Sequence, residues 1–130
     1  MIYFVKAKGS AYIKIGYSSD VPTRIRQLQT SHPKKLMVQA ILPGGYQTEV
    51  GIHELFGHLR TKGEWFRLSD ELSYFLRAIR RFPSESNIYV LYRASLQMRL
   101  KDKAKRLSAA GNDKLRRKIE IASMKLHKAS

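Results

Sequence analysis

Two charged side chains lie where the neighbouring residues form apolar helix faces. Arg24 comes three residues after Val21 and four before Leu28, and Glu49 comes three before Ile52. A half-buried charge is costly unless it is paired or binds something. A salt bridge between Arg24 and Glu49 is the ordinary structural explanation. The alternative explanation is that each of the two charges binds a ligand.

The elements that carry these residues predict a small α/β (α+β) domain. Alternating side chains predict strands at residues 2–5 and 11–15, joined as a hairpin. Capping residues before Val21 predict a helix over residues 21–30. The mostly apolar run at residues 36–42 predicts a third, central strand. We therefore expect a three-stranded, mainly antiparallel sheet flanked by helices.

Two further helices complete this predicted domain. Apolar residues at helical spacing predict a helix over residues 46–59. A turn at residues 61–63 follows it. The next helix begins at Ser69 or Asp70 and ends near Phe82.

The charge of the chain indicates a class of partner. Lys and Arg number 25 against 10 acids, which gives a net charge of +15. Such a field attracts polyanions, so nucleic acid is the expected partner. A ribosomal or chromatin-like protein, or one that binds an anionic membrane surface, would have a similar charge. The absence of cysteine excludes disulfides, thiolate zinc sites and cysteine nucleophiles.

The location of the protein is also an expectation from composition. The apolar start at residues 1–5 is too short for a signal peptide. No apolar run approaches the roughly 20 residues that cross a bilayer. We expect a cytoplasmic protein with no membrane partner.

The C-terminal third predicts a basic helical pair. Residues 83–87 are the best boundary, with a domain at 1–82 and an extension at 88–128, packed on that domain. Residues 93–128 carry 12 Lys or Arg and 3 acids. Helical Lys and Arg contact phosphates without reading sequence, although the same residues also suit a plain solvated face. The residues expected to bind nucleic acid here are Arg99, Lys103, Arg106, Arg116 and Arg117.

Several short motifs follow one another along the first domain. In order they are Tyr3 in the first strand, Lys14-Ile15-Gly16 at the end of the second, Arg24 eight residues after that glycine, Glu49 with His53 four residues on, and Gly63-Glu64-Trp65-Phe66. This ordered set resembles the GIY-YIG nuclease superfamily. The resemblance is closest to a phage and bacterial branch whose second motif reads Lys-Ile-Gly and whose domain ends near Gly-Glu-Trp-Phe.

The resemblance implies a role for each matching position. Tyr3 would abstract a proton from the attacking water, and Arg24 would hold the scissile phosphate and its growing charge. Lys14 stands at the tyrosine of the second motif, where a cation beside Tyr3 would favour the phenolate. Glu49 would bind one divalent metal, Mg²⁺ or Mn²⁺, together with waters and phosphate oxygens.

These implied roles match the needs of phosphodiester hydrolysis, which are a base for water, a cation on the phosphate and help for the leaving group. We therefore expect a metal-dependent DNA endonuclease, acting as a monomer or homodimer, with RNA the less favoured substrate. One alternative is a catalytically inactive nucleic-acid-binding module on the same fold. Another is an RNA-binding or ribosome-associated protein. Pure binding needs no acid facing the phosphate, so Glu49 favours the enzyme.

Other residues have two interpretations each. His53 could bind metal or phosphate or shuttle a proton, or it could be a partly buried histidine hydrogen-bonded to the sheet. Glu64 could be a second acid at the site, or it could pair with Arg60. Tyr17 and Arg26 are expected to contact nucleic acid, although Tyr17 also suits an ordinary surface position.

The remaining positions concern packing and departures from the family pattern. Met1 stands where the family has a glycine, and Asn87 is a weak candidate for the asparagine that many family members have near the domain end. Tyr12 shares the face of the second strand that carries Lys14, where packing is its usual role. Trp65 and Phe66 are expected in the core.

Overall fold

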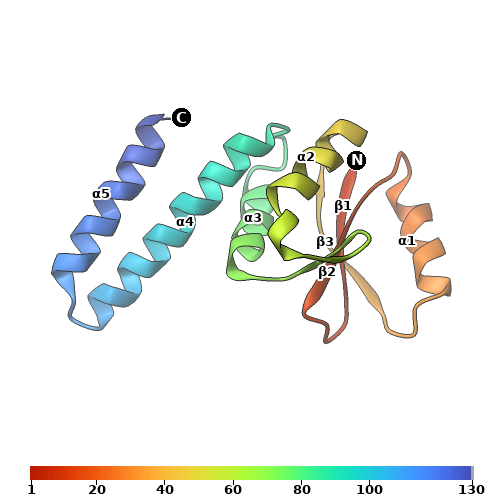
Figure 1. Ribbon diagram of the computed structural model, residues 1–130, viewed down its shortest axis with the longest axis horizontal. Coiled ribbons are helices and arrows are strands. Elements are labelled where there is room, and N and C mark those ends of the chain that lie inside the picture. The colour runs from red at the N-terminus through yellow and green to blue at the C-terminus, as the bar shows by residue number, and fades with distance from the viewer. Residues whose placement is uncertain (130) are drawn as a thin grey trace.

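Five strands form one antiparallel sheet in residues 1–129, the part of the chain that this computed structural model describes (Figure 1). Their spatial order is β3-β1-β2-β5-β4. The strands are β1 (Ile2–Ala7), β2 (Tyr12–Tyr17), β3 (Leu36–Leu42), β4 (Arg60–Lys62) and β5 (Trp65–Arg67). Side chains are described up to residue 126, so those of His127 and Lys128 at the end of the predicted extension lie outside it.

The α+β class is confirmed, but the sheet has five strands rather than the predicted three. The two additional strands, β4 and β5, contain three residues each. All three residues of β4 are polar and exposed, so no alternation of apolar residues marks this strand. Pairing with β5, which in turn pairs with β2, makes it a strand.

The prediction that residues 36–42 form a central strand was wrong, because β3 lies at the edge of the sheet. Its side chains Val38 and Ile41 are 43% and 39% exposed. Its pairing with β1 shifts register so that Val38 opposes Val5 and Ala40 opposes Phe4. Gln39 is thus the extra residue of a β-bulge. The guanidinium of Arg80 donates to its carbonyl oxygen at 3.0 Å.

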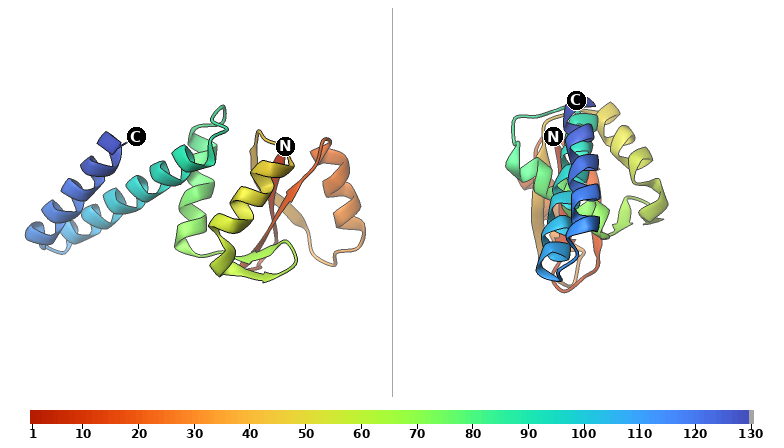
Figure 2. Two further views of the ribbon diagram at one scale, coloured as in Figure 1. Left: turned by 45° about the horizontal axis from the view of Figure 1, so that its top comes forward. Right: turned by 90° about the vertical axis from the view of Figure 1, so that its left-hand side faces the viewer.

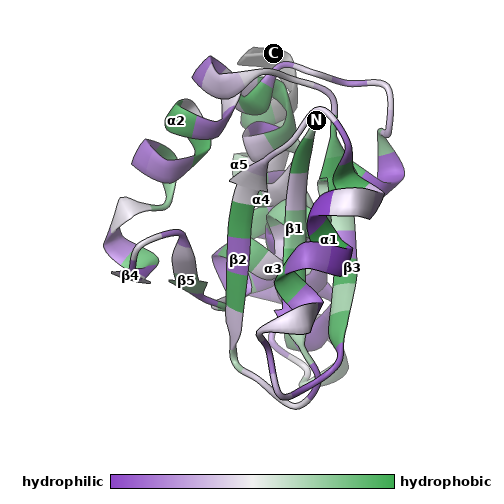
Figure 3. Cartoon of the chain, turned by 90° about the vertical axis from the view of Figure 1, so that its right-hand side faces the viewer, coloured by the Kyte–Doolittle hydropathy of each residue, from purple (hydrophilic) through white to green (hydrophobic). Residues whose placement is uncertain are grey.

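Helices cover both faces of the sheet (Figure 3). The helix α1 (Val21–Thr30) packs on one face through Val21, Ile25 and Leu28, against Tyr3 and other β1 residues. The helices α2 (Tyr46–Leu55), α3 (Asp70–Arg81) and α4 (Ile88–Ala109) pack on the opposite face. The strand β1 is therefore buried on both sides, which fixes its side chains in place.

The second helix is shorter than predicted. It ends at Leu55, and a 3-10 turn, η1 (Gly57–Leu59), completes the predicted span of residues 46–59. Gly57 is a poor helix former at the point where the helix ends. Phe56 and Leu59 are still buried in the core, so the apolar pattern marked burial correctly and the helix end incorrectly.

The C-terminal helices form a hairpin that extends away from the sheet (Figure 2). The first turn of α4 belongs to the core through Ile88 and Leu91. Further along, Tyr74 and Arg77 of α3 donate to Asp102 of α4 at 2.7 and 2.9 Å. The last helix, α5 (Asp113–Ala129), packs on α4. None of the helices in residues 1–129 is long and apolar enough to cross a membrane.

Candidate active site

The ring of Tyr3 fills a space that Gly16 leaves open. Tyr3 is 1% exposed and lies opposite Gly16 in the β1–β2 ladder. A Cβ atom on Gly16 would collide with the phenol oxygen and the ring carbon that bears it. The glycine of the Lys14-Ile15-Gly16 motif is therefore needed for space, because it lets the phenol of β1 lie across β2.

Arg24 reaches this phenol from α1. Asp20 caps the helix, accepting from the backbone N–H of Thr23 at 3.2 Å and from its hydroxyl at 2.7 Å. The guanidinium of Arg24 donates to the Tyr3 phenol, while the residue itself stays exposed. Among residues 1–126 no ion pair joins Arg24 to Glu49, so the ordinary salt-bridge explanation does not hold.

Glu49 is a buried acid on the first turn of α2. The residue is 7% exposed, and its carboxylate lies 3.8 Å from Nε2 of His53. Burial and the nearby charge of Glu64 raise the pKa of the Glu49 carboxyl, while His53 and Lys14 act in the opposite direction. Glu49 and Glu64 also share a hydrogen bond, so the two carboxyl groups lie in contact.

Glu64 reaches the site from the turn between β4 and β5. Gly63, with φ of +56°, makes this turn, and a left-handed conformation there favours glycine. The Glu64 carboxylate lies 3.2 Å from Nζ of Lys14. Arg60 instead donates to the carbonyl of Gly63. Of the two interpretations, a second acid at the site is the one that the geometry supports.

The electrostatics of Tyr3 differ from the expectation. Burial raises the pKa of its phenol, and the charges of Glu64 and Glu49 raise it further. The hydrogen bond and charge of Arg24 lower it, but the net direction is upward. Lys14 was expected to be the cation that favours the phenolate. Its ammonium is instead paired with Glu64 and lies 5.6 Å from the Trp65 ring. The cation that lowers the pKa of Tyr3 is therefore Arg24.

His53 is bonded to the sheet. Its Nε2 lies 2.9 Å from the carbonyl oxygen of Ile15, and a carbonyl only accepts, so Nε2 carries a proton. The ring packs on Phe66 with centroids 5.0 Å apart. Ile15 donates its N–H to the Glu64 carbonyl, the last bond of the β2–β5 edge. His53 therefore satisfies the carbonyl oxygen of Ile15. This contact is the structural interpretation of His53, a partly buried histidine hydrogen-bonded to the sheet.

A divalent cation fits the carboxyl pair. Oxygen ligands are those that Mg²⁺ prefers, and Glu49 and Glu64 supply them from two elements. Burial, and after it the charge of Glu64, raise the pKa of the Glu49 carboxyl, and a cation bound between the two acids would counter both effects. Within residues 1–126 no group of three or more His, Asp or Glu residues can hold a metal. Waters and substrate oxygens would therefore complete the coordination, as in many Mg²⁺ sites.

Three further residues named from the sequence, Tyr17, Arg26 and Asn87, lie at different distances along the chain from Tyr3. Tyr17 is 41% exposed at the end of β2, one residue after Gly16. Arg26 is exposed on α1 and donates to the hydroxyl of Thr23 at 3.0 Å. Asn87 caps α4, accepting from the N–H of Tyr89 at 3.0 Å. It is therefore a capping residue rather than part of the site.

The basic residues of the hairpin fall into two groups. Arg99, Lys103 and Arg106 of α4 are exposed and line one groove of about 460 Å³. On α5, Arg117 is exposed, whereas Arg116 is paired with Glu120 at 2.8 Å and with Asp113. The structure therefore gathers the first three residues and leaves Arg116 occupied within its own helix.

Sequence reasoning underrated two residues of the site region. Glu64 was left with two interpretations, and its position directly after the turn-forming Gly63 was the available signal that it is a second acid at the site. Trp65 was expected in the core beside Phe66, but only Phe66 is fully buried. Strand alternation was the missed signal there, since consecutive strand residues face opposite sides of a sheet.

The fold and the site together define a nuclease-like or nucleic-acid-binding α+β module. Residues 1–83 match the T5orf172 domain, and the chain belongs to this family. The domain is phage-derived and linked to nuclease-like families related to GIY-YIG, although the chain gives no direct GIY-YIG match. No curated protein and no solved structure matches the chain.

Proposed function

We propose that the protein is a metal-dependent DNA endonuclease. The observation that carries this proposal is the meeting of Tyr3, Arg24 and Glu49, which come from β1, α1 and α2. A phenol with a guanidinium on its oxygen lies beside the buried carboxyl of Glu49 and the partly exposed carboxyl of Glu64. A protein that only binds nucleic acid has no use for two adjacent acids next to the phosphate, because they repel it.

The residues divide the reaction among them. The phenolate form of Tyr3 takes the proton of the attacking water, which becomes the nucleophile. Arg24 holds that phenolate and, being exposed on its outer side, also donates to the phosphate as its charge grows. Glu49 and Glu64 would hold Mg²⁺ or Mn²⁺. When bound, this cation would stabilise the leaving oxygen or orient the phosphate, and its charge would offset the acids that raise the pKa of Tyr3.

The rest of the chain supplies affinity. Its net charge of +15 draws DNA to the surface. The exposed cations Arg99, Lys103 and Arg106 add phosphate contacts outside the site. DNA is the proposed partner on this ground.

Incubation with supercoiled plasmid tests the proposal, in the presence of Mg²⁺, Mn²⁺ or EDTA. Glu49→Gln removes the metal-binding acid and keeps the shape of the side chain. Its matched control is Glu54→Gln, an exposed glutamate on the same helix. Metal-dependent nicking that Glu49→Gln loses and Glu54→Gln keeps is the expected result. If neither the wild type nor the control cuts plasmid, single-stranded or branched DNA while all three proteins bind DNA equally, the protein is a binding module and the proposal fails.

A further inference from the structure

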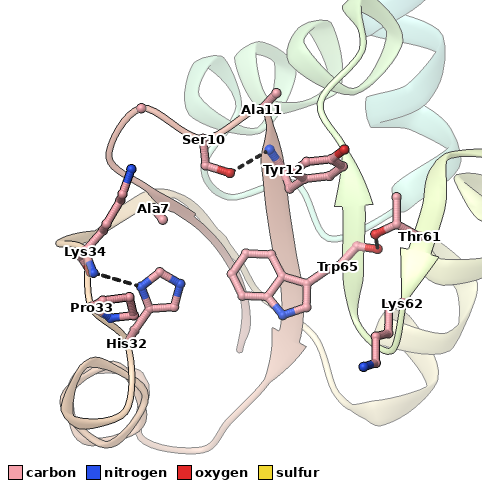
Figure 4. A pocket seen from close by; sticks show the side chains of 11 residues that line it. Ala7, Ser10, Ala11, Tyr12, His32, Pro33, Lys34, Thr61, Lys62 and Trp65 are labelled. Atoms are coloured by element: carbon pink, nitrogen blue, oxygen red, sulfur yellow. Dashed lines mark hydrogen bonds between the residues drawn. The ribbon is translucent and has the colours of Figure 1, made fainter.

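A groove lined by aromatic residues adjoins the candidate active site (Figure 4). It encloses about 680 Å³ between β2, β4, β5 and the loop that joins α1 to β3. Its principal side chains are Tyr12, His32, Pro33, Lys34, Lys62 and Trp65. None of the assigned roles in phosphodiester cleavage uses them.

Three rings face this groove. Tyr12 is 44% exposed, and Trp65 is half-buried on the same face of the sheet. The His32 ring lies opposite, with its centroid 6.2 Å from that of Trp65 and its plane tilted by 33°. Figure 4 shows the imidazole and the indole pointing toward one another across the groove. At this distance the two rings already form an aromatic pair, so a flat ligand would stack on the accessible faces of Tyr12 and Trp65 rather than between the indole and the imidazole.

The charge around the rings is positive. Lys34 and Lys62 line the groove from opposite sides, and no carboxylate lines it among the described side chains. The loop that carries His32 and Lys34 is held in place by Gln29. The Gln29 amide donates to the Lys34 carbonyl at 2.9 Å and accepts from the Leu36 N–H at 2.8 Å. The groove is therefore preformed, which lowers the entropic cost of binding.

Lys14 lies between the groove and the candidate active site. Nζ of Lys14 lies 5.6 Å from the centre of the Trp65 ring and 3.2 Å from the Glu64 carboxylate. Glu64 also contacts the Glu49 carboxyl. The side chain of Lys14 thus separates the Trp65 indole from the proposed metal ligands Glu49 and Glu64. A nucleotide chain that places a phosphate at Arg24 and Glu49 would have the groove beside its path, because Lys14 connects Glu64 to the Trp65 ring.

We propose that this groove binds an unpaired nucleobase of the substrate beside the phosphate that is cut. The inference rests on the proposed nuclease function and names its substrate class, which is DNA with a single-stranded, flapped or locally unstacked segment. Aromatic stacking requires a free base face, and in a paired duplex both faces are occupied by neighbouring bases. Lys34 and Lys62 would contact the phosphates on either side of that base.

Trp65 makes the test direct, because it is the only tryptophan of the chain. The full-length protein is titrated in EDTA with oligothymidylate, a blunt DNA duplex, and the same duplex with an unpaired tail. Binding is followed by anisotropy and stacking by tryptophan fluorescence. The expected result is quenching by the oligothymidylate and the tailed duplex, with little quenching by the blunt duplex.

Variants locate the effect. Tyr12→Ser removes one stacking face and is expected to weaken binding of the tailed duplex by at least about fivefold, with the blunt duplex unchanged. The matched control is Tyr89→Ser on α4, where the tyrosine is 67% exposed and far from the groove in sequence. Both sites are exposed, so folding, checked by circular dichroism, is expected to be retained.

Two results overturn the inference, namely equal quenching by the blunt and tailed duplexes, and tight binding of the tailed duplex without quenching. Neither depends on cleavage, since no metal is present. A protein that cuts DNA but quenches without selectivity refutes the groove and keeps the nuclease. Selective quenching by a protein that never cuts refutes the nuclease and keeps the groove.

Discussion

The active site and the α4–α5 hairpin hold their charges in opposite ways. At the site, Tyr3, Arg24, Glu49 and Glu64 come from four segments, and the other three all act on the pKa of Tyr3. In the hairpin, Arg116 of α5 is paired within a single helix, with Asp113 and Glu120. The buried carboxylate of Glu49 opposes folding, whereas exposed charges such as those of the hairpin cost little.

The two regions should therefore respond differently to mutation. Each group at the site depends on several others, so a single substitution is expected to have a large and specific effect. If each hairpin cation contacts one phosphate, as proposed, the effect of its removal is expected to be small, graded and dependent on salt.

The largest effect is expected for Glu49→Gln, which should reduce cleavage to the level measured in EDTA while making the protein more stable. Because burial raises the pKa of this carboxyl above its ordinary 4.5, the native state loses stability as the pH rises through the folded-state pKa. The variant should therefore melt higher at neutral pH, by roughly 4 °C for each 1 kcal/mol. The difference should vanish as the pH falls below about 4.5, as thermal melts will show. A lower Tm at pH 7 would contradict this account.

Arg24→Gln is expected to lower the cleavage rate about 10²–10³-fold, since it removes a charged donor from the growing charge. It should also move the alkaline rise of the pH–rate profile to higher pH, because Arg24 lowers the pKa of Tyr3. Glu64→Gln should move the same rise to lower pH, because the Glu64 charge raises that pKa. Identical profiles for the two variants would show that Tyr3 is not the group that titrates.

Gly16→Ala is expected to reduce cleavage about 10²-fold, because the new Cβ displaces the Tyr3 ring. DNA affinity should change little, since no cation is removed. Gly57→Ala is the matched control, because nothing lies within contact of a Cβ at that position. If plasmid nicking assays show equal rates for the two variants, the position of the phenol is not critical.

The smallest effect on turnover is expected from the hairpin. The triple variant Arg99→Gln, Lys103→Gln, Arg106→Gln should leave the rate at saturating DNA unchanged. The slope of log affinity against log salt should become less steep by about 0.9 for each phosphate that the variant no longer neutralises. Arg116→Gln should have little effect on that slope, because its charge is already paired. A fall in turnover in the triple variant would mean that the hairpin takes part in the chemistry.

The sequence predicted those parts of the molecule whose signals are local. The bounds of α1 and of β3 agree with the structure residue for residue, because capping residues and an apolar run mark them. The convergence of Tyr3, Arg24 and Glu49 followed from their order along the chain and a family resemblance. No local rule relates residues that lie more than 20 positions apart.

The parts that escaped prediction depend on pairing across the sheet. The polar residues of β4 become a strand because β5 pairs with them, and no composition signal marks that event. The ion pair of Lys14 with Glu64 follows from the same pairing, since β5 brings the preceding turn beside β2. Sequence reasoning therefore placed Lys14 near Tyr3 correctly as a neighbour in the sheet, but assigned its charge to the wrong partner.

The β-bulge at Gln39 has a consequence for the behaviour of concentrated protein. An edge strand with a regular row of free N–H and C=O groups invites a strand from another molecule to pair with it, which leads to aggregation. On β3 the bulge interrupts that row, and the cation of Arg80 occupies the carbonyl that would begin a new ladder. We expect this edge to reject a second chain despite the exposed Val38 and Ile41, and Arg80→Ala to aggregate sooner on heating.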